Sequence, residues 1–474
     1  MIGREKEARV LLDALHSNKA ELVAVVGRRR VGKTYLVQSV LADVLDFEAT
    51  GVPNSTVRPQ LQNFRELVME LGDTSLPQAT DWNTAFLQLR RALKALPEIG
   101  RKRVLFFDEL PWLASRRSGF LEAFSFFWNN YAVRNRLLVV ICGSAASWMI
   151  RKVIDHKGGL YNRVTRRIDL EPFTLHETEL YLRSEKSLHL NRRQIIELYQ
   201  VMGGIPHYLD QVDRSLSVAQ NIDALCFERG GFLRREFDRL YPALFDHPDR
   251  HIAVVRAIAA QWQGRTRADI ARTADISSGG ALTRILRELE FSGFIRPYFS
   301  MSRKKKQMLY RLTDEYSNFY LKFIEDKRPQ EAGTWLGIVG SGTYHAWAGY
   351  AFEGICLKHD RQIKQALGIA GIPVETATFR FAGNDGMPGT QIDMLLHRAD
   401  DCIHLCEVKF TKERFVVTKA YAERLATKRM VLDYALGGTK QLFVTLISAT
   451  GLSENVHSRG VVDQVVGVDG LFVA

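Results

Sequence analysis

Two groups of residues in this sequence have types and spacings that suit chemistry on phosphate groups. The first group has the pattern GxxxxGKT and consists of Gly27, Arg28, Arg29, Arg30, Val31, Gly32, Lys33 and Thr34. A loop of this pattern aims backbone N–H groups at one anion, while its lysine reaches the β- and γ-phosphates and its threonine hydroxyl holds Mg²⁺. These residues therefore predict a nucleotide site that takes ATP and Mg²⁺.

A buried strand and a helix must flank such a loop. Residues 22–26 are aliphatic without helical spacing, which predicts the strand, and residues 35–40 predict the first turns of the helix. A chance match in a glycine-containing turn is the alternative. Because both flanking elements are present in the required order, the phosphate-binding interpretation is favoured.

Two carboxylates follow a second apolar segment. Residues 103–107 predict a strand that leads into Asp108 and Glu109. Beside the phosphate loop, Asp108 would hold the Mg²⁺ shell, and Glu109 would orient or deprotonate the attacking water. Acidic residues that only cap the end of a strand are the alternative, and the upstream GxxxxGKT pattern argues against it.

Two further residues are candidates for contacts near the γ-phosphate. Ser144 follows a third apolar segment, residues 137–143, where it would sense the γ-phosphate, but a serine here equally suits the N-cap of a helix. Arg163 lies in a strand predicted over residues 160–173 and would serve as an arginine finger toward a neighbouring subunit, which implies a homo-oligomer. Arginines on a surface strand are also commonly solvated or bound to acidic neighbours.

The second group of residues lies near the C-terminus and suits metal-dependent chemistry on phosphodiesters. Glu407 and Lys409 are two positions apart in a strand predicted over residues 402–410, so their side chains point to the same face. Asp393 precedes them by the length of a hairpin between neighbouring strands. Two carboxylates on such strands can hold Mg²⁺, and Lys409 would orient or help deprotonate a water for attack.

A helix predicted over residues 343–358 adds Glu353, which is a further candidate metal ligand beside Asp393 and Glu407. An E-x-K pair on an amphipathic strand is also an everyday surface pair, and this is the alternative interpretation. The apolar neighbours of the pair favour a strand inside a sheet; they are Leu405, Val408 and Phe410.

The segment between the two groups predicts three helices followed by a hairpin, which is the outline of a winged helix. The third helix, predicted over residues 281–291, would present polar side chains to a DNA groove, and lysines 304–306 at the hairpin tip would meet phosphates. The polar side chains are Ser278, Thr283, Arg284 and Arg287. Modules of this kind also pack internally or bind protein. The segment favours nucleic acid, and DNA in particular, as a partner.

Composition agrees with an anionic partner without choosing it. The chain of 474 residues has a formal net charge of +12, which favours nucleic acid or a membrane surface equally. The charged N-terminal residues predict no signal peptide, and no apolar run reaches the length of a spanning helix, so no membrane partner is predicted. The cysteines lack a C-x-x-C pair, which predicts buried free thiols and a cytoplasmic location; they are Cys142, Cys226, Cys356, Cys402 and Cys406.

Six motifs occur in one order over roughly residues 1–250: IGREKE, GRRRVGKT, FFDELPWL, ICGSAASWM, LYNRVTRRIDLEPF and GGIPHYL. Together they resemble the archaeal-type ATPases, P-loop proteins of the AAA+/STAND group. The resemblance implies that Arg163 occupies the arginine position of the family's glycine–arginine pair, with Asn162 in place of the glycine. It also implies that Gly203, Gly204 and Pro206 shape a helical lid over the nucleotide, where helices are predicted over residues 175–184 and 192–202.

The C-terminal group also has a family resemblance. The glycine-bounded loop 383–389, Asp393, the E-x-K strand and the helical Glu353 resemble the PD-(D/E)xK nuclease superfamily, although Gln391 and Ile392 stand where the motif name has its proline. The expected fold class is α/β. It comprises a P-loop NTPase core (1–173), a helical lid (174–250), a winged helix (251–325) and a restriction-endonuclease-like domain (335–474), with a linker at 326–333.

The leading hypothesis is an ATP-binding and ATP-hydrolysing protein that engages DNA and cleaves it with its metal-dependent tail. A slow ATP-dependent signalling or scaffold switch, whose winged helix and tail bind nucleic acid or protein without cleavage, is the second hypothesis. A transcription regulator built on the winged helix is the third.

Overall fold

The computed structural model describes residues 2–72, 75–115, 117–144, 146–154, 160, 162–301, 307–328, 333–384 and 386–474. The chain forms two compact units, Met1–Glu171 and Pro172–Ala474. The first unit ends close to the predicted boundary at residue 173. The parts predicted as lid, winged helix and tail all lie in the second unit, and their division into three domains stays a prediction.

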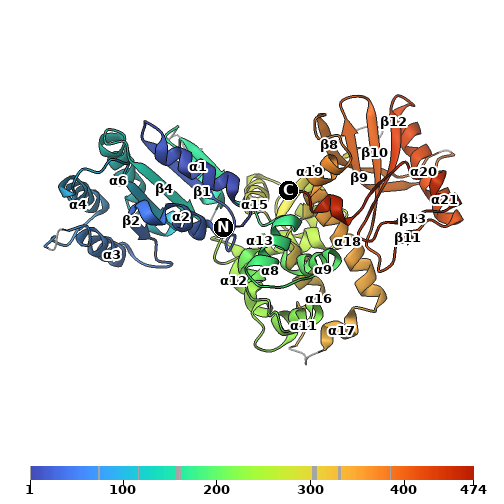
Figure 1. Ribbon diagram of the computed structural model, residues 1–474, viewed down its shortest axis with the longest axis horizontal. Coiled ribbons are helices and arrows are strands. Elements are labelled where there is room, and N and C mark those ends of the chain that lie inside the picture. The colour runs from blue at the N-terminus through green and yellow to red at the C-terminus, as the bar shows by residue number, and fades with distance from the viewer. Residues whose placement is uncertain are drawn as a thin grey trace. The chain divides into compact units, whose positions relative to one another are not determined.

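A parallel sheet of five strands forms the centre of the first unit (Figure 1). Its order is β2-β3-β4-β1-β5. The strands are β1 (Glu21–Val26), β2 (Leu45–Thr50), β3 (Val104–Asp108), β4 (Leu138–Gly143) and β5 (Arg166–Asp169). The helices are α1 (Glu5–His16), α2 (Lys33–Leu41), α3 (Val57–Met69), α4 (Trp82–Ala95), α5 (Leu110–Leu113), α6 (Phe120–Phe127) and α7 (Ala146–Met149). The predicted α/β fold with a parallel core is confirmed.

The burial of the central strands accounts for their apolar sequences, and the pairing of these strands determines where the first candidate site lies. β1, β3 and β4 are buried at every position, because strands of a parallel sheet are covered on both faces. β4 pairs with β1 on one side and with β3 on the other. The carboxyl ends of these strands therefore share one edge of the sheet, where Gly27, Asp108 and Ser144 lie.

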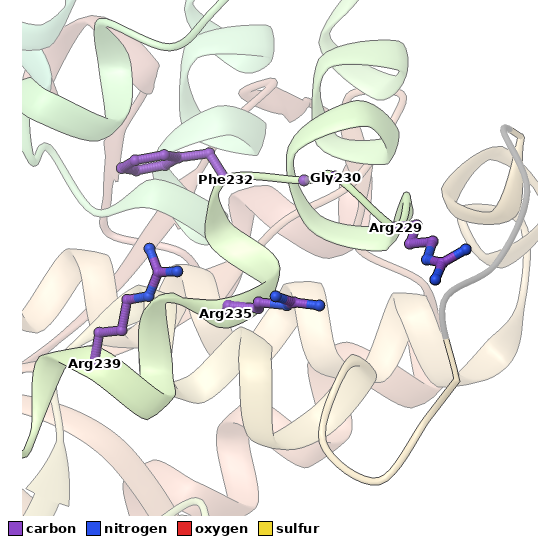
Figure 2. A pocket seen from close by; sticks show the side chains of 6 residues that line it. Arg229, Gly230, Phe232, Arg235 and Arg239 are labelled. Carbon is purple, nitrogen blue, oxygen red and sulfur yellow. The ribbon is translucent and has the colours of Figure 1, made fainter.

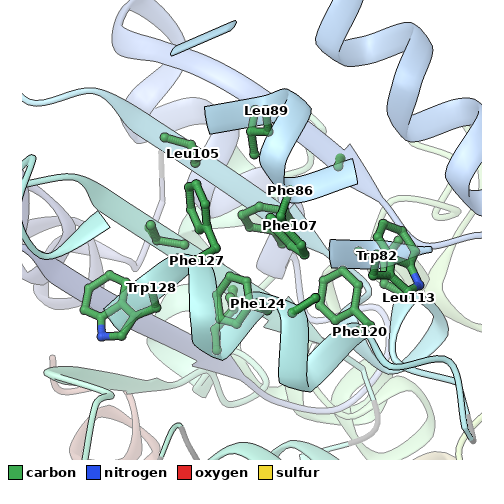
Figure 3. Packing of buried hydrophobic residues seen from close by; sticks show 14 of the residues in the cluster. Trp82, Phe86, Leu89, Leu105, Phe107, Leu113, Phe120, Phe124, Phe127 and Trp128 are labelled. Atoms are coloured by element: carbon green, nitrogen blue, oxygen red, sulfur yellow. The ribbon is translucent and has the colours of Figure 1, made fainter. Parts of the chain in front are cut away.

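Aromatic side chains hold α4 and α6 against the sheet (Figure 3). The ring centroids of Phe107 and Phe124 are 5.3 Å apart, and those of Trp82 and Phe120 are 4.8 Å apart. Rings in such edge-to-face contacts bury large apolar areas and stabilise the packing of the elements that carry them. The contacts fix β3, the strand that ends in Asp108.

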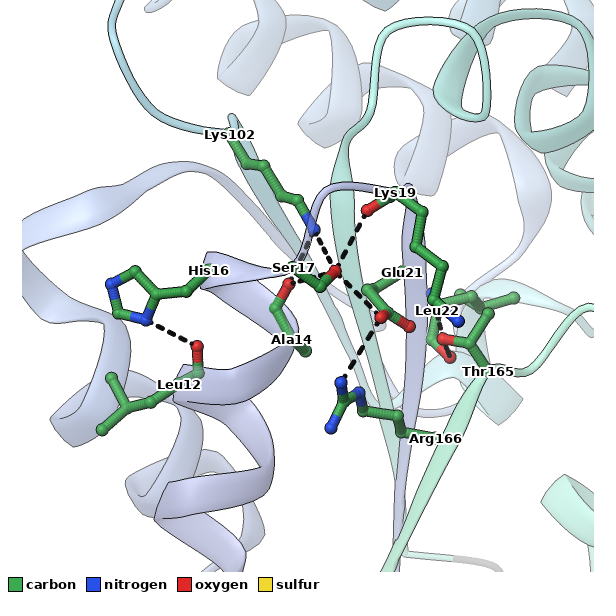
Figure 4. A network of polar contacts seen from close by, with 10 residues as sticks. All are labelled: Leu12, Ala14, His16, Ser17, Lys19, Glu21, Leu22, Lys102, Thr165 and Arg166. Atoms are coloured by element: carbon green, nitrogen blue, oxygen red, sulfur yellow. Dashed lines mark hydrogen bonds and ion pairs between the residues drawn. The ribbon is translucent and has the colours of Figure 1, made fainter.

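A polar network around buried Glu21 holds the amino end of β1 (Figure 4). Ser17 Oγ donates a hydrogen bond of 2.9 Å to Glu21 Oε1, and Arg166 Nη2 on β5 lies 3.5 Å from the same oxygen. Lys102 Nζ donates to Ser17 Oγ at 2.7 Å. Because a buried carboxylate needs hydrogen-bonded or charged partners, this network ties the start of β1 to α1 and β5.

One predicted strand is shorter in the structure. The sequence pattern predicts a strand over residues 160–173, whereas β5 covers only Arg166–Asp169. Asn162 has a φ of 54°, in the left-handed region, which interrupts an extended backbone. Arg163 therefore lies in a turn before the strand.

The second unit is helical in its first part (Figure 1). Its first helices are α8 (Leu175–Ser184), α9 (Arg192–Met202), α10 (Pro206–Leu209), α11 (Val218–Ile222) and α12 (Glu236–Leu240). Three helices and a hairpin then follow in the predicted order: α13 (Pro248–Ala259), α14 (Arg267–Thr273), α15 (Gly280–Phe291), β6 (Ile295–Met301) and β7 (Gln307–Leu312). The predicted wing lysines 304–306 lie outside the described residues.

The C-terminal part of the second unit adds helices and strands to this hairpin. The helices are α16 (Glu315–Phe323), α17 (Thr334–Ile338), α18 (Gly342–Lys358), α19 (Asp360–Ala366), α20 (Lys419–Leu436) and α21 (Val456–Arg459). The strands are β8 (Val374–Phe381), β9 (Thr390–Arg398), β10 (Cys402–Lys409), β11 (Phe415–Val416), β12 (Gln441–Ser448), β13 (Leu452–Ser453) and β14 (Gln464–Val466).

A seven-stranded mixed sheet with the order β14-β12-β10-β9-β8-β6-β7 joins the hairpin to the tail. β9 and β10 pair antiparallel, which confirms the hairpin predicted between Asp393 and Glu407. β6 pairs parallel with β8, with Phe299 opposite Ala377. The predicted wing and the predicted nuclease-like domain therefore share one sheet, a relationship that the predicted linker at 326–333 does not suggest.

Two composition-based predictions can be compared with the structure. All the cysteines are buried and free, as predicted. Within the described part of the chain, no helix combines the length and the hydropathy that crossing a membrane requires.

Candidate functional site

The phosphate loop has a backbone path that only glycine allows at two positions. Gly32 has a φ of 90°, at the point where α2 begins. A Cβ on Gly27 would lie 2.4 Å from the carbonyl oxygen of Leu170, so β5 approaches the loop too closely for any side chain. The two glycines of GxxxxGKT therefore shape the loop before the amino end of a helix, where an anion is stabilised.

Lys33 is buried at the centre of this site. Its Nζ donates hydrogen bonds to the carbonyl oxygen of Arg28 at 2.8 Å and to Ser144 Oγ at 3.2 Å. Burial lowers the pKa of Lys33, and the negative charges of Glu109 and Asp108 partly oppose this shift. A phosphate group bound here would supply the negative charge that stabilises a buried ammonium group.

Thr34 and Asp108 bring two oxygen atoms together beside the lysine. Thr34 Oγ1 donates a hydrogen bond of 2.7 Å to Asp108 Oδ2, and the second carboxylate oxygen accepts from the backbone N–H of Glu109 at 2.8 Å. Magnesium prefers hydroxyl, carboxylate and phosphate oxygens. The pair therefore has the donor chemistry that Mg²⁺ requires, on the side of the loop where the phosphates would lie.

Glu109 and Ser144 form the third part of the site. The Ser144 hydroxyl donates to Glu109 Oε1, and the Ser144 backbone N–H donates to Oε2 at 3.2 Å. Glu109 has a φ of 45°, a left-handed conformation that costs a non-glycine residue about 1 kcal/mol or more and is common in active sites. Because Ser144 also accepts from Lys33, its hydroxyl connects the lysine of the loop to the proposed catalytic carboxylate.

The structure explains the asparagine in the predicted glycine–arginine pair. Asn162 has a φ of 54°, a conformation that asparagine tolerates better than most residues other than glycine. The Arg163 side chain is exposed and forms no ion pair with any described residue. It is therefore accessible to a second molecule, and its role as an arginine finger stays a prediction.

Sequence patterns gave no individual role to Arg4, although it lies in the IGREKE motif. Its Nη2 donates to the carbonyl oxygens of Glu171 at 2.8 Å and of Val31 at 3.4 Å. Arg4 thereby connects the N-terminal segment to the phosphate loop and to the segment after β5. The position of Arg4 directly before α1 is the only local signal for this contact.

Two glycines of the GGIPHYL motif are required by their surroundings in the second unit. A Cβ on Gly204, which has a φ of 59°, would lie 2.1 Å from the carbonyl oxygen of Phe173. Gly203 has a φ of 64°, and a Cβ there would lie 2.4 Å from Glu315 Oε2. The motif therefore has a packing role here, while the lid function of Gly203, Gly204 and Pro206 stays a prediction.

The residues of the E-x-K strand come together around Glu407. Lys409 Nζ donates to Oε1 of Glu407 at 2.9 Å, as expected for two side chains on one face of β10. Helix α20 adds Tyr421, whose hydroxyl donates to Oε1 at 2.5 Å, and Lys428, whose Nζ donates to Oε2 at 2.9 Å. Burial alone would raise the pKa of Glu407, but Lys409, Lys428 and Tyr421 bring it down to about 2.

Glu353 on α18 is the least satisfied member of this cluster. Burial, the Asp393 carboxylate and, to a smaller extent, Glu407 raise the pKa of Glu353 to about 8, against the attraction of Arg311 and Lys409. Glu353 Oε2 accepts no hydrogen bond from the described residues, and its nearest positive charge is Arg311 Nη2 at 3.9 Å. Asp393 is oriented by Gln391, whose Nε2 donates to Oδ1 at 2.6 Å.

These contacts give one observation against and one in favour of a metal site formed by Glu353, Asp393 and Glu407. Among the described residues, no three His, Cys, Asp or Glu side chains are arranged so that they could hold a metal ion, and Glu407 is surrounded by ammonium and hydroxyl donors instead. The Glu353 oxygen that lacks a hydrogen bond nevertheless fits a hard divalent cation in its chemistry. Binding of Mg²⁺ by Glu353, Asp393 and Glu407 stays a prediction.

Sequence analysis missed the contributions of Tyr421, Lys428 and Arg311. Tyr421 and Lys428 are two helical turns apart, so their spacing places them on one face of α20, but nothing local connects that face to Glu407. Arg311 belongs to β7, in the segment predicted as the wing. Only the continuous sheet brings it to the tail.

The predicted DNA-facing side chains of the winged helix are accessible. Ser278, Arg284 and Arg287 are exposed, and Thr283 is half-buried. The Thr283 hydroxyl donates to the carbonyl oxygen of Gly279 at 3.3 Å, which helps to fix the start of α15. The face is available to a partner, and DNA binding stays a prediction.

Comparison with known proteins concerns the N-terminal part most directly. Residues 1–212 match the family described as an ATPase domain predominantly from Archaea. The uncharacterized protein MJECL04 of Methanocaldococcus jannaschii is 25% identical over 358 residues, which cover 74% of this chain and 75% of that protein. Residues 1–212 therefore match an ATPase domain of this kind, which supports the resemblance of this part of the chain to archaeal-type ATPases.

Two solved structures are similar at the level of the fold. The Walker-type ATPase PABY2304 of Pyrococcus abyssi is 19% identical with a TM-score of 0.47, and the match covers 68% of this chain and 96% of that one. The Aeropyrum pernix ORC2 protein in its ADPNP–ADP complexes is 14% identical with a TM-score of 0.41, covering 72% and 96%.

Proposed function

We propose that the ATPase domain binds ATP with Mg²⁺ and hydrolyses it, and that the second unit couples this reaction to nucleic acid. The observation that carries the first half is the chain of contacts from Lys33 through Ser144 to Glu109, beside the Thr34–Asp108 pair. Phosphate ligand, magnesium ligands and a base for water thus gather at the carboxyl edge of one parallel sheet.

Each of these residues has a defined task. The N–H groups of the loop and Lys33 bind the β- and γ-phosphates, and Thr34 and Asp108 hold Mg²⁺, which neutralises phosphate charge when bound. Glu109 accepts the proton of the attacking water. Ser144 donates hydrogen bonds to both oxygens of Glu109. A γ-phosphate offers Ser144 and Lys33 a stronger acceptor, which leaves the Glu109 carboxylate free to orient water.

Arg163 acts on the nucleotide of a neighbouring subunit in this proposal. Its exposed side chain without an ion pair among the described residues supports an intermolecular role. A guanidinium group placed against the γ-phosphate stabilises the charge of the transition state. Hydrolysis should then depend on protein concentration, because the finger belongs to a homo-oligomer.

Nucleotide binding is tested with Lys33→Ala and a fluorescent ATP analogue. Loss of the buried ammonium group should weaken binding by about tenfold or more, as expected for a charge-assisted contact with phosphate. Lys94→Ala, on a helix away from the loop, is the matched control and should bind like the parent. Equal affinities of the parent and Lys33→Ala would contradict the nucleotide site.

The second half of the proposal concerns DNA. The α13–α15 helices with the β6–β7 hairpin act as a winged helix, and the tail acts as a restriction-endonuclease-like domain that cleaves DNA. The Glu353 oxygen that accepts no hydrogen bond from the described residues supports this function, together with the contact of Lys409 with Glu407. Glu353, Asp393 and Glu407 would hold Mg²⁺, which supplies electrophilic assistance at phosphate when bound. Lys409 stabilises negative charge and orients the attacking water.

Cleavage is tested by incubating the protein with single- and double-stranded DNA and RNA in Mg²⁺ or Mn²⁺. The parent should cut, and Lys409→Ala should not. Lys440→Ala, which removes a lysine bound to Asp401 on the surface, should cut like the parent. If the parent cuts nothing but its ATP turnover changes when DNA is added, the alternative of a slow switch that binds without cleavage is supported instead.

A further inference from the structure

A pocket lined by arginines lies in the second unit, outside every site predicted from the sequence (Figure 2). Its volume is about 500 Å³. It is lined by Arg229, Gly230, Gly231, Phe232, Arg235 and Arg239. Pockets of this size accept a nucleotide-sized group and exceed what a single small anion fills.

The three arginines of the pocket carry positive charge that no acid among the described residues neutralises. Arg229, Arg235 and Arg239 are exposed, and none of their side chains forms an ion pair or hydrogen bond with another described residue. Arg234, beside them in the sequence, differs because its guanidinium donates to the carbonyl oxygens of Phe227 at 3.4 Å and Lys327 at 2.5 Å. Arg234 is therefore a structural residue, whereas the three lining arginines are available to a ligand.

The nearby acids do not satisfy these arginines. Glu236 is buried, and it accepts a hydrogen bond of 3.0 Å from the hydroxyl of Tyr208. Glu228 and Asp238 form no ion pair with the lining arginines. The pocket consequently presents a net positive surface.

The remaining walls of the pocket are fixed by the fold. A Cβ on Gly231 would lie 2.5 Å from the carbonyl oxygen of Leu225, so the turn packs against the preceding helix only with glycine. The Phe232 ring lies edge-to-face on His207 and Tyr208, at centroid distances of 5.3 and 6.4 Å. Figure 2 shows Phe232 and Arg239 on the same side of the pocket and Arg229 beyond the turn. A ring packed against His207 and Tyr208 therefore stands beside the exposed guanidinium groups.

Arginines beside an aromatic ring favour a ligand that carries both a phosphate group and a base or sugar. Guanidinium groups bind phosphate oxygens through paired hydrogen bonds, and they are the preferred side chains for phosphate recognition. An aromatic ring beside them offers a surface to a base or a sugar. Carboxylates would use the same arginines but would gain nothing from the ring.

We propose that this pocket binds the phosphodiester backbone of a nucleic-acid strand. The inference rests on the proposed engagement of nucleic acid, and it adds a contact separate from the α15 face. A free nucleotide offers the same phosphate chemistry, so the two sources must be distinguished by experiment.

The test compares two triple variants of the full chain that remove equal charge. The first carries Arg229→Ala, Arg235→Ala and Arg239→Ala. The control removes three exposed arginines elsewhere in the second unit, and it carries Arg183→Ala, Arg214→Ala and Arg361→Ala. Binding of a fluorescent single-stranded and a double-stranded oligonucleotide is measured by anisotropy at several salt concentrations, after thermal melting has shown that both variants are folded.

The pocket variant should bind about tenfold more weakly than the parent, and its slope of log K against log[salt] should fall by about 2, the value for three phosphate contacts on a single strand. The control should keep the parental slope. Equal losses in the two variants would overturn the pocket proposal alone, because nucleic-acid binding would persist elsewhere. A parent that binds neither oligonucleotide would overturn both this inference and the proposed function. If millimolar AMP displaces the fluorescent oligonucleotide as effectively as unlabelled oligonucleotide does, the ligand of the pocket is a free nucleotide and not a strand.

Discussion

Arg311 Nη2 lies 3.9 Å from Glu353 Oε2, and both atoms are buried without a hydrogen-bond partner among the described residues. Arg311 belongs to the hairpin predicted as the wing, and Glu353 belongs to the helix that carries a proposed metal ligand. The shared sheet brings the two together. The charge on the hairpin therefore acts directly on the proposed catalytic centre of the tail.

This pair should be energetically coupled. Above the pKa of Glu353 of about 8, where its carboxylate is charged, removing one partner leaves the other buried without its counter-charge. At pH 9, Arg311→Met and Glu353→Gln should therefore each lower the free energy of unfolding by about 1–3 kcal/mol. The double variant should lose less than the sum by about 1 kcal/mol. Urea unfolding of the four proteins measures this difference, and strictly additive losses would show that the two groups do not interact.

The raised pKa of Glu353 predicts a pH dependence of stability. The folded protein holds a proton on Glu353 up to a pKa of about 8, whereas the unfolded chain releases it near the ordinary value of 4.5. The stabilising contribution is therefore fully present below pH 4.5 and is lost as pH rises toward 8. Between pH 6 and pH 8 the loss should be about 2 kcal/mol.

Glu353→Gln removes this dependence and serves as the comparison. The free energy of unfolding of the parent should fall relative to the variant as pH rises from 6 to 8 in urea titrations. His359 and His404 also contribute in this window, because burial lowers the pKa of each to about 4 in the folded protein whereas the unfolded chain binds a proton near 6.5. Both proteins share these histidines, so their contribution cancels in the comparison. Parallel pH profiles of the two proteins would contradict the protonated state assigned to Glu353.

Lys428 should oppose metal binding in the tail. Its ammonium group lies 2.9 Å from Glu407 Oε2, so a divalent cation bound to that carboxylate would face a like charge. Lys428→Met should therefore tighten Mn²⁺ binding by about tenfold, a change equivalent to roughly 1.4 kcal/mol. Calorimetric titration with Mn²⁺ measures the affinity. Lys440→Met is the control, and an unchanged or weaker affinity in Lys428→Met would place the metal elsewhere or exclude it.

Local sequence patterns predict a large share of this structure. Helices α8 and α9 begin and end where their patterns predict, because each starts with a capping box, Thr174 with Glu177 and Asn191 with Gln194. The phosphate loop, the Asp108 strand and the Asp393–Glu407 hairpin are also local patterns, and each depends on residues close together in the sequence.

The rest depends on contacts between distant residues. No local pattern indicates that β6 pairs with β8 across several helices, and Arg311 reaches Glu353 only through that pairing. Tyr421 and Lys428 reach Glu407 only when α20 folds back over β10. Likewise, the strand predicted over 160–173 is interrupted at Asn162 by a left-handed conformation that the residue types alone do not demand.

Substitution by alanine should have opposite effects on stability at two glycines, Gly204 in the GGIPHYL motif and Gly349 in α18. Gly204→Ala would place a Cβ 2.1 Å from the Phe173 carbonyl oxygen in a left-handed conformation, so it should lower the free energy of unfolding by about 2–4 kcal/mol. Gly349→Ala lies inside α18 with no atom within 4 Å of the new Cβ, so it should stabilise by about 0.5–1 kcal/mol. Chemical denaturation measures both, and similar effects would contradict the steric argument.

Hydrolysis of ATP by Glu109→Gln tests the central claim most directly. The amide keeps the size of the side chain and one acceptor oxygen for the Ser144 backbone N–H, but it cannot accept the proton of the attacking water. Phosphate release and binding of a fluorescent ATP analogue are measured side by side for the parent and the variant. The proposed mechanism predicts that the variant binds ATP as tightly as the parent and hydrolyses it on the order of 100-fold more slowly. Equal rates of phosphate release in the two proteins would contradict it.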